Sequence, residues 1–435
     1  MKSARQVAVE ALLRVEEGKS WSNLTLDALL TKHITDPREG AFASALVYGV
    51  LERKLTLDAC IAAHSKLKLS KLSPVIHAIL RITVYQLLYM DKVPDHSAVN
   101  EAVELTRTLK MGKTSGFVNG ILRAFLRDEK RIPIPAEPLS AALGVEYSVP
   151  EPLVTLWLEA YGEEKTLAIL QASMGQPPQF IRVNTLRTTD EALLARLEAR
   201  GYRAEETALA HCFILSGPGA AVKLPEFEEG LFHVQDISSQ LCVKALQVAL
   251  GMRVLDACAA PGGKSLTIAQ YLGGEGALLS TDLRENRVPL MQKQAERMGI
   301  SQMECRRADM TVLDPSLGQF DRVLCDVPCS GYGVIRRKPE IKYKPLEEFS
   351  GLPEIQYKIL RTASHYVKEG GRLIYSTCTL HPVENSGVVR RFLEENLEFV
   401  PVPLEIDDSA ETERTLIGHL QGDGFFMAAL QRASR

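Results

Sequence analysis

Two cysteines lie in short loops where a reactive thiol could be held. Cys329 lies in the string DVPCSG and Cys378 in the string STCT, and each string follows a predicted strand. A thiolate is a strong nucleophile, although a single cysteine is more often a small buried hydrophobe. Two thiols at strand ends, beside the carboxylate of Asp326 and near a predicted cofactor loop, favour a reactive site over two buried residues.

The predicted cofactor loop is the string ACAAPGGKS, which follows a strand ending at Asp256. Its small residues would let the backbone approach a ligand closely, and ligands of open α/β sheets bind at the carboxyl ends of the strands. The same string is also typical of an ordinary tight turn between strand and helix. A nicotinamide dehydrogenase is disfavoured because the loop lacks the spacing G-x-G-x-x-G.

Acidic residues follow four successive predicted strands, which is a stronger indication of a ligand site than the loop alone. Asp282 lies roughly 20 residues after the glycines, where an acid binds ribose hydroxyls in dinucleotide folds. The full set is Asp256, Asp282, Asp309 and Asp326.

The elements that would position these residues fall into three predicted domains. Residues 1–135 show apolar residues at intervals of three and four, as in Val7-Ala8-Ala11-Leu12-Val15, and predict an all-α bundle with breaks near Pro37, Pro74 and Pro94. Four prolines in residues 131–150 predict a linker. Residues 145–228 predict a small α/β module.

Residues 229–435 alternate predicted strands and helices. The strands are expected at 253–255, 277–281, 322–325 and 372–375. This alternation predicts a parallel sheet with helices on both faces, which is a Rossmann-like domain.

Three long strings carry a resemblance to a known family. LDACAAPGGKS, DVPCSGYGVIRRKPEIKY and IYSTCTLHPVEN closely resemble the NOL1/NOP2/Sun family of RNA cytosine-C5 methyltransferases, and residues 1–125, with the string GFVNGILR, resemble the NusB-like RNA-binding domain. A NusB-like domain followed by a methyltransferase domain is similar to the arrangement in the family's bacterial enzymes for 16S rRNA. The resemblance covers nearly the whole chain and is weakest over residues 131–225.

The resemblance implies roles for particular residues. Cys378 would be the nucleophile. The chemistry of the reaction, rather than the resemblance, makes Asp326 the best candidate for an acid at the edge of the base, and Cys329 is placed to help as a base or to steer release. Residues implied to line the S-adenosylmethionine site are Cys258, Ala259, Ala260, Pro261, Gly262, Gly263, Lys264, Asp282, Asp309 and Asp326. The family's Glu-Asn pair is present as Glu384-Asn385.

The chemistry explains why thiols are needed. C5 of cytosine is too weak a nucleophile for a sulfonium methyl, but a thiolate added at C6 makes C5 enamine-like. The base must first be unstacked, which RNA loops allow at low cost. Basic residues after the Pro-Cys string are candidates for phosphate contacts, or else form a solvated loop: Arg336, Arg337, Lys338 and Lys342.

Charge and composition indicate which partners, cellular location and metal content to expect. Residues 1–131 hold 20 Lys and Arg against 14 Asp and Glu, while the remainder holds 31 against 40, so a basic N-terminal part is joined to an acidic body. No apolar run could span a membrane, no secretory signal is visible, and the eight scattered cysteines lack zinc spacing. We expect a cytoplasmic monomer without metal.

Two alternatives remain. The first is C5 methylation of another RNA, such as tRNA or 23S rRNA. The second is a non-catalytic RNA-binding or antitermination factor, which the intact thiols and acids disfavour.

Overall fold

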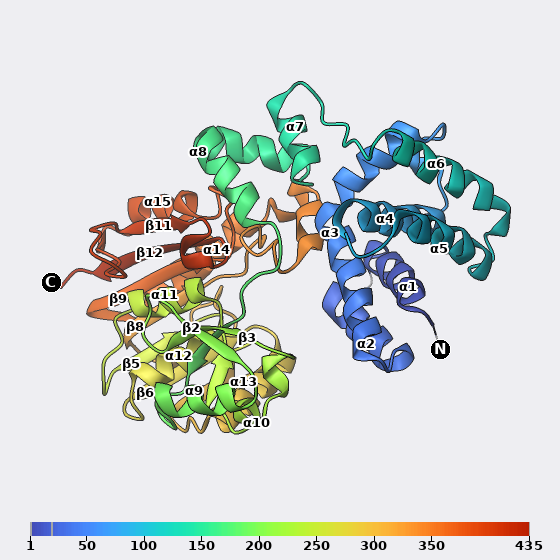
Figure 1. Cartoon of the computed structure of the whole chain (residues 1–435). Coiled ribbons are helices and arrows are strands. Elements are labelled where there is room, and N and C mark those ends of the chain that lie inside the picture. The colour runs from blue at the N-terminus through green and yellow to red at the C-terminus, as the bar shows by residue number, and fades with distance from the viewer. Residues whose placement is uncertain (1, 19–20, 435) are drawn as a thin grey trace. The chain divides into compact units, whose positions relative to one another are not determined.

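The protein consists of two compact units in the computed structural model, which describes residues 2–18 and 21–434. The first unit contains residues 1–174 together with 335–346, and the second contains 175–334 together with 347–435. Figure 1 draws the first mainly in blue to green helices and the second around sheets. No helix within the described ranges is long and apolar enough to cross a membrane.

The first unit is helical, as its apolar periodicity predicts. Its helices are α1 (Ala4–Glu16), α2 (Ser22–His33), α3 (Pro37–His64), α4 (Pro74–Tyr89), α5 (Asp95–Thr108), α6 (Ser115–Arg127), α7 (Leu139–Glu146) and α8 (Glu151–Ala172). All three predicted breaks are confirmed, because α3 and α4 begin at Pro37 and Pro74, and Pro94 is the N-cap of α5. Proline suits the first helical position, where its missing N–H costs nothing. The predicted linker is in part helical, since α7 lies within it.

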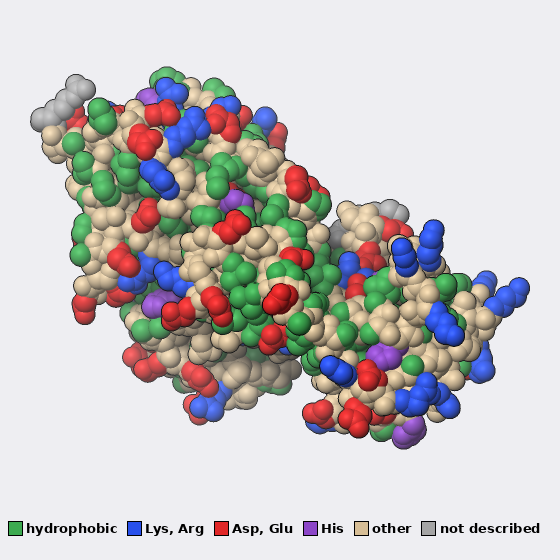
Figure 2. Space-filling model, turned by 90° about the horizontal axis from the view of Figure 1, so that it is seen from above, with side chains coloured by type: hydrophobic (Ala, Val, Ile, Leu, Met, Phe, Trp, Pro, Cys, Tyr) green, Lys and Arg blue, Asp and Glu red, His purple; other side chains and the backbone are tan. Residues whose placement is uncertain are grey.

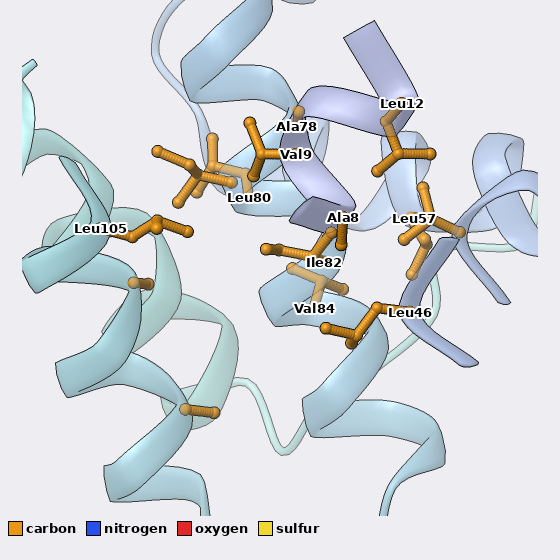
Figure 3. Packing of buried hydrophobic residues seen from close by; sticks show 14 of the residues in the cluster. Ala8, Val9, Leu12, Leu46, Leu57, Ala78, Leu80, Ile82, Val84 and Leu105 are labelled. Carbon is orange, nitrogen blue, oxygen red and sulfur yellow. The ribbon is translucent and has the colours of Figure 1, made fainter. Parts of the chain in front are cut away.

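Apolar side chains from α1, α3, α4, α5 and α6 form one core in this unit. Figure 3 shows Ala8 and Leu12 of α1 facing Ile82 of α4 and Leu57 of α3. On the surface of the same unit, at the right of Figure 2, Lys and Arg side chains are frequent. The unit therefore combines an apolar helical interior with a partly basic exterior.

Residues 335–346 follow the Pro-Cys loop in sequence but pack in the helical unit. They contain the short 3-10 helix η6 (Pro339–Tyr343). Lys342 donates from Nζ to the carbonyl of Glu52 at 2.8 Å, and the hydroxyl of Tyr343 donates to the carbonyl of Leu51 at 2.7 Å. These bonds fix η6 against α3.

A four-stranded antiparallel sheet opens the second unit, in the order β2-β3-β1-β4. Its strands are β1 (Phe180–Val183), β2 (Arg203–Glu206), β3 (Cys212–Ser216) and β4 (Phe232–Val234). Leu193 and Leu197 of α9 (Asp190–Ala199) pack on this sheet, and the four-residue helix α10 (Pro225–Glu228) precedes β4. A small α/β module was predicted in this region.

The main sheet has the order β10-β12-β9-β8-β5-β6-β7, with β11 paired to β12. Its strands are β5 (Arg253–Asp256), β6 (Ala277–Asp282), β7 (Met303–Arg307), β8 (Phe320–Asp326), β9 (Val367–Thr377), β10 (Phe399–Pro401), β11 (Glu413–Leu416) and β12 (Phe425–Arg432). The four predicted strands are confirmed as β5, β6, β8 and β9. The sheet is mixed rather than wholly parallel, because β10, β11 and β12 pair antiparallel.

Helices cover both faces of the main sheet, as predicted. Val254 and Leu324 point into a core with α11 (Ile237–Ala245), α12 (Gly263–Tyr271) and α13 (Val288–Met298). Their neighbours Leu255 and Val323 point into the opposite core, with α14 (Leu352–Ser364) and α15 (Ser386–Glu395). Alternation of side chains along each strand thus fills both layers.

Candidate active site

Two neighbouring parallel strands bring the cysteine loops to one edge of the main sheet. β8 and β9 pair Asp326 with Ser376, so Cys329 and Cys378 follow the two strand ends at nearly the same level. Their Sγ atoms lie 3.2 Å apart. Both thiols therefore lie at the same edge of the main sheet.

The two thiols differ in acidity. The hydrogen bond with Cys329 lowers the pKa of Cys378 below that of an ordinary thiol, and the Lys264 ammonium acts in the same direction against burial and Asp326. The same hydrogen bond, with burial, raises the pKa of Cys329 well above the ordinary range. Cys378 therefore ionises more readily than Cys329.

A partly buried ion pair lies beside the thiols. Lys264 donates from Nζ to Oδ2 of Asp326 at 2.6 Å, and the hydroxyl of Ser376 donates to Oδ1 at 2.9 Å. Burial opposes the charge on Lys264, but Asp326 outweighs that effect and raises the pKa of Lys264 above its ordinary value. Lys264 thus stays cationic next to Cys378, and both oxygens of Asp326 act as acceptors.

A buried carboxylate connects the two cysteine loops. Glu384, which follows Cys378 in sequence, accepts hydrogen bonds from Ser330 N at 3.0 Å, Ser330 Oγ at 2.5 Å and Gln356 Nε2 at 2.8 Å. Gln356 also donates to the carbonyl of Pro328 at 2.9 Å. Since Ser330 adjoins Cys329, Glu384 holds the Pro-Cys loop against the Thr-Cys loop.

A close backbone crossing completes this edge. Gly333 donates from N to the carbonyl of Cys378 at 3.0 Å, and Gly424 donates from N to the carbonyl of Gly333 at 2.8 Å. A Cβ on Gly333 would lie 1.9 Å from the carbonyl oxygen of Gly424. Only glycine can stand there without moving backbone, so both loops keep their spacing.

Three domain families match consecutive parts of the chain. The family described as 16S rRNA methyltransferase RsmB/F matches residues 243–431, the NusB family matches 2–127, and an RsmF/B-like ferredoxin-like domain matches 149–222. A protein of Bacillus subtilis (strain 168) named as a probable ribosomal RNA small subunit methyltransferase B is 35% identical over 99% of each chain. The chain belongs to the RsmB/F family of 16S rRNA methyltransferases.

Solved structures agree on the fold of this RsmB/F chain. The crystal structure of PH0851 covers 99% of the chain and is itself covered to 98%, with a TM-score of 0.82 and 24% identity. The crystal structure of NSun6 from Pyrococcus horikoshii with SFG covers 66% of the chain and is covered to 99%, with a TM-score of 0.60 and 20% identity. At these identities the likeness concerns the fold alone.

Membership of the RsmB/F family implies S-adenosylmethionine as the methyl donor, and the loop between β5 and α12 fits a ligand of this kind. Gly262 has φ of +105°, a conformation that favours glycine. Among the described residues, Asp256 Oδ1 and Gln235 Nε2 are buried without a hydrogen-bond partner, as groups that await a ligand would be. Burial raises the pKa of Asp256 to about 7, although Ser265 donates to it.

The two remaining candidate acids, Asp282 and Asp309, differ in exposure and in hydrogen-bond partners. Asp282 is 7% exposed at the end of β6, accepts from Arg284 N at 2.8 Å and lies 3.5 Å from Arg287. Asp309 is exposed and accepts from Thr311 N and Oγ1, within its own turn. Ala259 donates from N to the carbonyl of Thr281 at 2.7 Å, so the residue before Asp282 contacts the loop between β5 and α12.

The basic candidates for RNA contact all lie in the segment that packs in the helical unit. Lys338 is exposed, and Arg336 and Arg337 are half-buried. Lys342 is 2% exposed and hydrogen-bonded to a helix carbonyl, so it does not reach a phosphate from this position. The expectation that it belongs to an exposed basic stretch is corrected by its burial against α3.

Sequence reasoning missed several residues of the RsmB/F site. Gln356, Ser330 and Gly424 had no assigned part, and Glu384 was noted only as one of a pair. The signal that could have identified them is weak, since a polar residue inside a predicted helix, such as Gln356, gives no sign of burial. Only the tertiary structure shows that these residues connect the cysteine loops.

Proposed function

We propose that this RsmB/F protein transfers a methyl group from S-adenosylmethionine to C5 of a cytosine in 16S rRNA, through a covalent bond between Cys378 and C6 of the base. The observation that carries the proposal is the contact of 3.2 Å between the thiols of Cys329 and Cys378, with Lys264 beside them. Attack on C6 of the base needs only one thiol, so the second thiol calls for a separate role. Two thiols of unequal acidity suit a reaction in which one attacks and the other handles a proton.

Cys378 is the nucleophile in this proposal. The pKa of Cys378 is lowered, and the Lys264 ammonium is one of the causes of that lowering. A lowered pKa favours the nucleophilic thiolate over the thiol. Attack on C6 moves electron density to C5. S-adenosylmethionine supplies an electrophilic methyl group, which C5 accepts.

Cys329 would remove the proton from C5 so that the bond to Cys378 can break. Its raised pKa results first from the hydrogen bond to Cys378. Once Cys378 has bonded to the base, its sulfur is no longer an anion and this cause is weakened. Cys329 would then ionise more easily, at the stage of the reaction that needs a base.

Asp326 would contact the edge of the cytosine. Both carboxylate oxygens of Asp326 are acceptors, from Lys264 and Ser376. As an acceptor, Asp326 would bind the amino hydrogens on N4 of cytosine directly. To act as an acid at N3, it would first need to gain a proton. Both contacts would favour the attacked form of the base. The surrounding loop of residues 258–264, with Asp282 and Asp309, would bind the methyl donor.

The experiment that tests this function follows hydrogen at C5. The protein is incubated with S-adenosylmethionine and 16S rRNA transcribed with cytosine tritiated at C5. Methylation at C5 releases tritium to water, whereas methylation at N4 or at a ribose does not. Release that depends on Cys378 supports the proposal, and methyl transfer without release contradicts it. The same assay with tRNA and 23S rRNA tests the other RNA substrates, and absence of any transfer would favour a non-catalytic RNA-binding factor.

A further inference from the structure

An exposed tryptophan in the helical unit lies close to two lysines. Trp21 precedes α2 and is 42% exposed, whereas the other tryptophan of the chain, Trp157, is fully buried. Lys338 and Lys344 each place Nζ 5.3 Å from the centroid of the Trp21 ring, and both lysines are exposed. Trp21, Lys338 and Lys344 are called the Trp21 cluster below.

The Trp21 cluster is held in place by partly buried hydrogen bonds. Ser22 donates from N at 3.1 Å and from Oγ at 2.8 Å to Oε1 of Glu340, which ties the start of α2 to η6. Lys342 and Tyr343 bond to carbonyls of α3, as described above. The lysines at the two ends of η6 are thereby fixed near one aromatic ring.

These groups match the chemistry of unpaired RNA. A nucleobase stacks on an aromatic face whatever its sequence, and ammonium groups beside that face attract the adjoining phosphates. We propose that the Trp21 cluster binds an unpaired nucleotide of the RNA substrate, with the base stacked on Trp21 and phosphates near Lys338 and Lys344. This site rests on RNA being the substrate, which the proposed function also requires.

The chain connects this site to the reacting thiols. Lys338 follows Cys329 by only nine positions, and nine extended residues span at most about 30 Å. Stacked nucleotides rise about 3.4 Å each, so a continuously stacked strand would cross that span in about nine nucleotides. A contact so near the target would align the RNA strand as well as retain it.

Fluorescence can test the site directly because the chain has only two tryptophans. In a Trp157→Phe background, Trp21 is the sole tryptophan. Titration with a single-stranded oligoribonucleotide of mixed sequence should quench its emission. Unchanged emission while the RNA binds, as measured by anisotropy of a label on the RNA, would overturn the proposal.

Affinity gives a second measurement. Trp21→Ala should weaken binding of the same oligonucleotide by about five- to a hundredfold, and Trp21→Phe should retain most of it. Lys338→Gln and Lys344→Gln should each reduce the salt dependence of binding by about 0.7 in slope, whereas Lys92→Gln, at another exposed lysine of the same unit, should reduce neither the affinity nor the slope as much. Equal affinity of Trp21→Ala and the parent would contradict the stacked base, and thermal melting would confirm that each variant is folded.

This test is separate from that of the proposed function. Quenching and binding need neither methyl donor nor reaction. If RNA quenches Trp21 but no tritium is released from C5, the chemistry is wrong and the binding site stands. If tritium is released but Trp21→Ala binds RNA normally, the site is wrong and the chemistry stands.

Discussion

The sulfur atoms of Cys329 and Cys378 lie 3.2 Å apart, and the strands that precede them pair Asp326 with Ser376. The separation is set by the register of β8 and β9 together with the bonds from Glu384 to the Pro-Cys loop. Such a pair allows one thiol to transfer a proton while the other is bonded to the base. The division of labour between them can be measured.

Cys378→Ala should abolish both methylation and any covalent complex, because it removes the attacking atom. Cys329→Ala should leave attack intact but impair release, and a protein–RNA adduct should accumulate. Denaturing electrophoresis would retain the adduct, and protease treatment would remove it. An adduct with Cys378→Ala but not with Cys329→Ala would reverse the roles. If neither variant lost activity, covalent catalysis by either thiol would be excluded.

The acidity of Cys378 gives a prediction about pH. Its lowered pKa means that the thiolate persists to lower pH than in a free cysteine and is lost as pH falls through that pKa. The rate of alkylation of Cys378 by iodoacetamide should follow the thiolate fraction. Lys264→Met and Cys329→Ala each remove a cause of the lowering, so the midpoint of the rate profile should move to higher pH. Mass spectrometry of the modified peptide would assign the site, and an unmoved midpoint in both variants would refute this account.

Asp282→Ala should weaken binding of S-adenosylmethionine by about ten- to a hundredfold, since loss of a charge-assisted hydrogen bond costs about 1.5–3 kcal/mol. Isothermal titration calorimetry measures this directly. Asp309→Ala is the matched comparison, because Asp309 is exposed and bonded within its own turn. An affinity unchanged by Asp282→Ala would remove this residue from the cofactor site.

Glu384→Ala should lower the free energy of unfolding of the protein by about 2 kcal/mol or more. It leaves Ser330 N buried without its acceptor and removes one of the two acceptors of Gln356 Nε2, and an unsatisfied buried group costs about 1–3 kcal/mol. It should also slow adduct formation in the Cys329→Ala background, because the Pro-Cys loop is no longer fixed. Exposed Glu394 offers a control, and Glu394→Ala should change the melting temperature little. Equal melting temperatures for the two variants would show that Glu384 does not hold the loops.

The sequence allowed much of this architecture to be predicted because local pattern determined it. Apolar periodicity and proline positions identified the helices of the first unit, and the strands that lead to Asp256, Asp282 and Asp326 were found from their alternation with helices. β12 was missed because its apolar string FFMAAL has no period that separates a strand from a buried helix. The burial of Lys342 was missed because its partner, Glu52, lies 290 residues away, and no local pattern reports such a contact.

Lys342 provides a stability prediction whose sign depends on pH. Burial lowers its pKa from 10.5 to about 7. As pH falls from about 10.5 to 7, the unfolded chain binds a proton that the folded chain does not, so the folded state loses stability over that range. Lys342→Met keeps an unbranched side chain of similar length and removes the titrating group.

The difference in free energy of unfolding between Lys342→Met and the parent should therefore grow in favour of the variant as pH falls from about 10 to 7. Below 7 the difference should stay constant, because both states of the parent are then protonated. Urea unfolding at several pH values measures this, with Lys338→Met as a control at an exposed lysine. Lys342→Met lacks the hydrogen bond to the carbonyl of Glu52 at every pH. This loss shifts the whole curve of free energy difference against pH by a constant amount and leaves its slope unchanged. A difference independent of pH between 7 and 10 would show that Lys342 keeps an ordinary pKa in the folded protein.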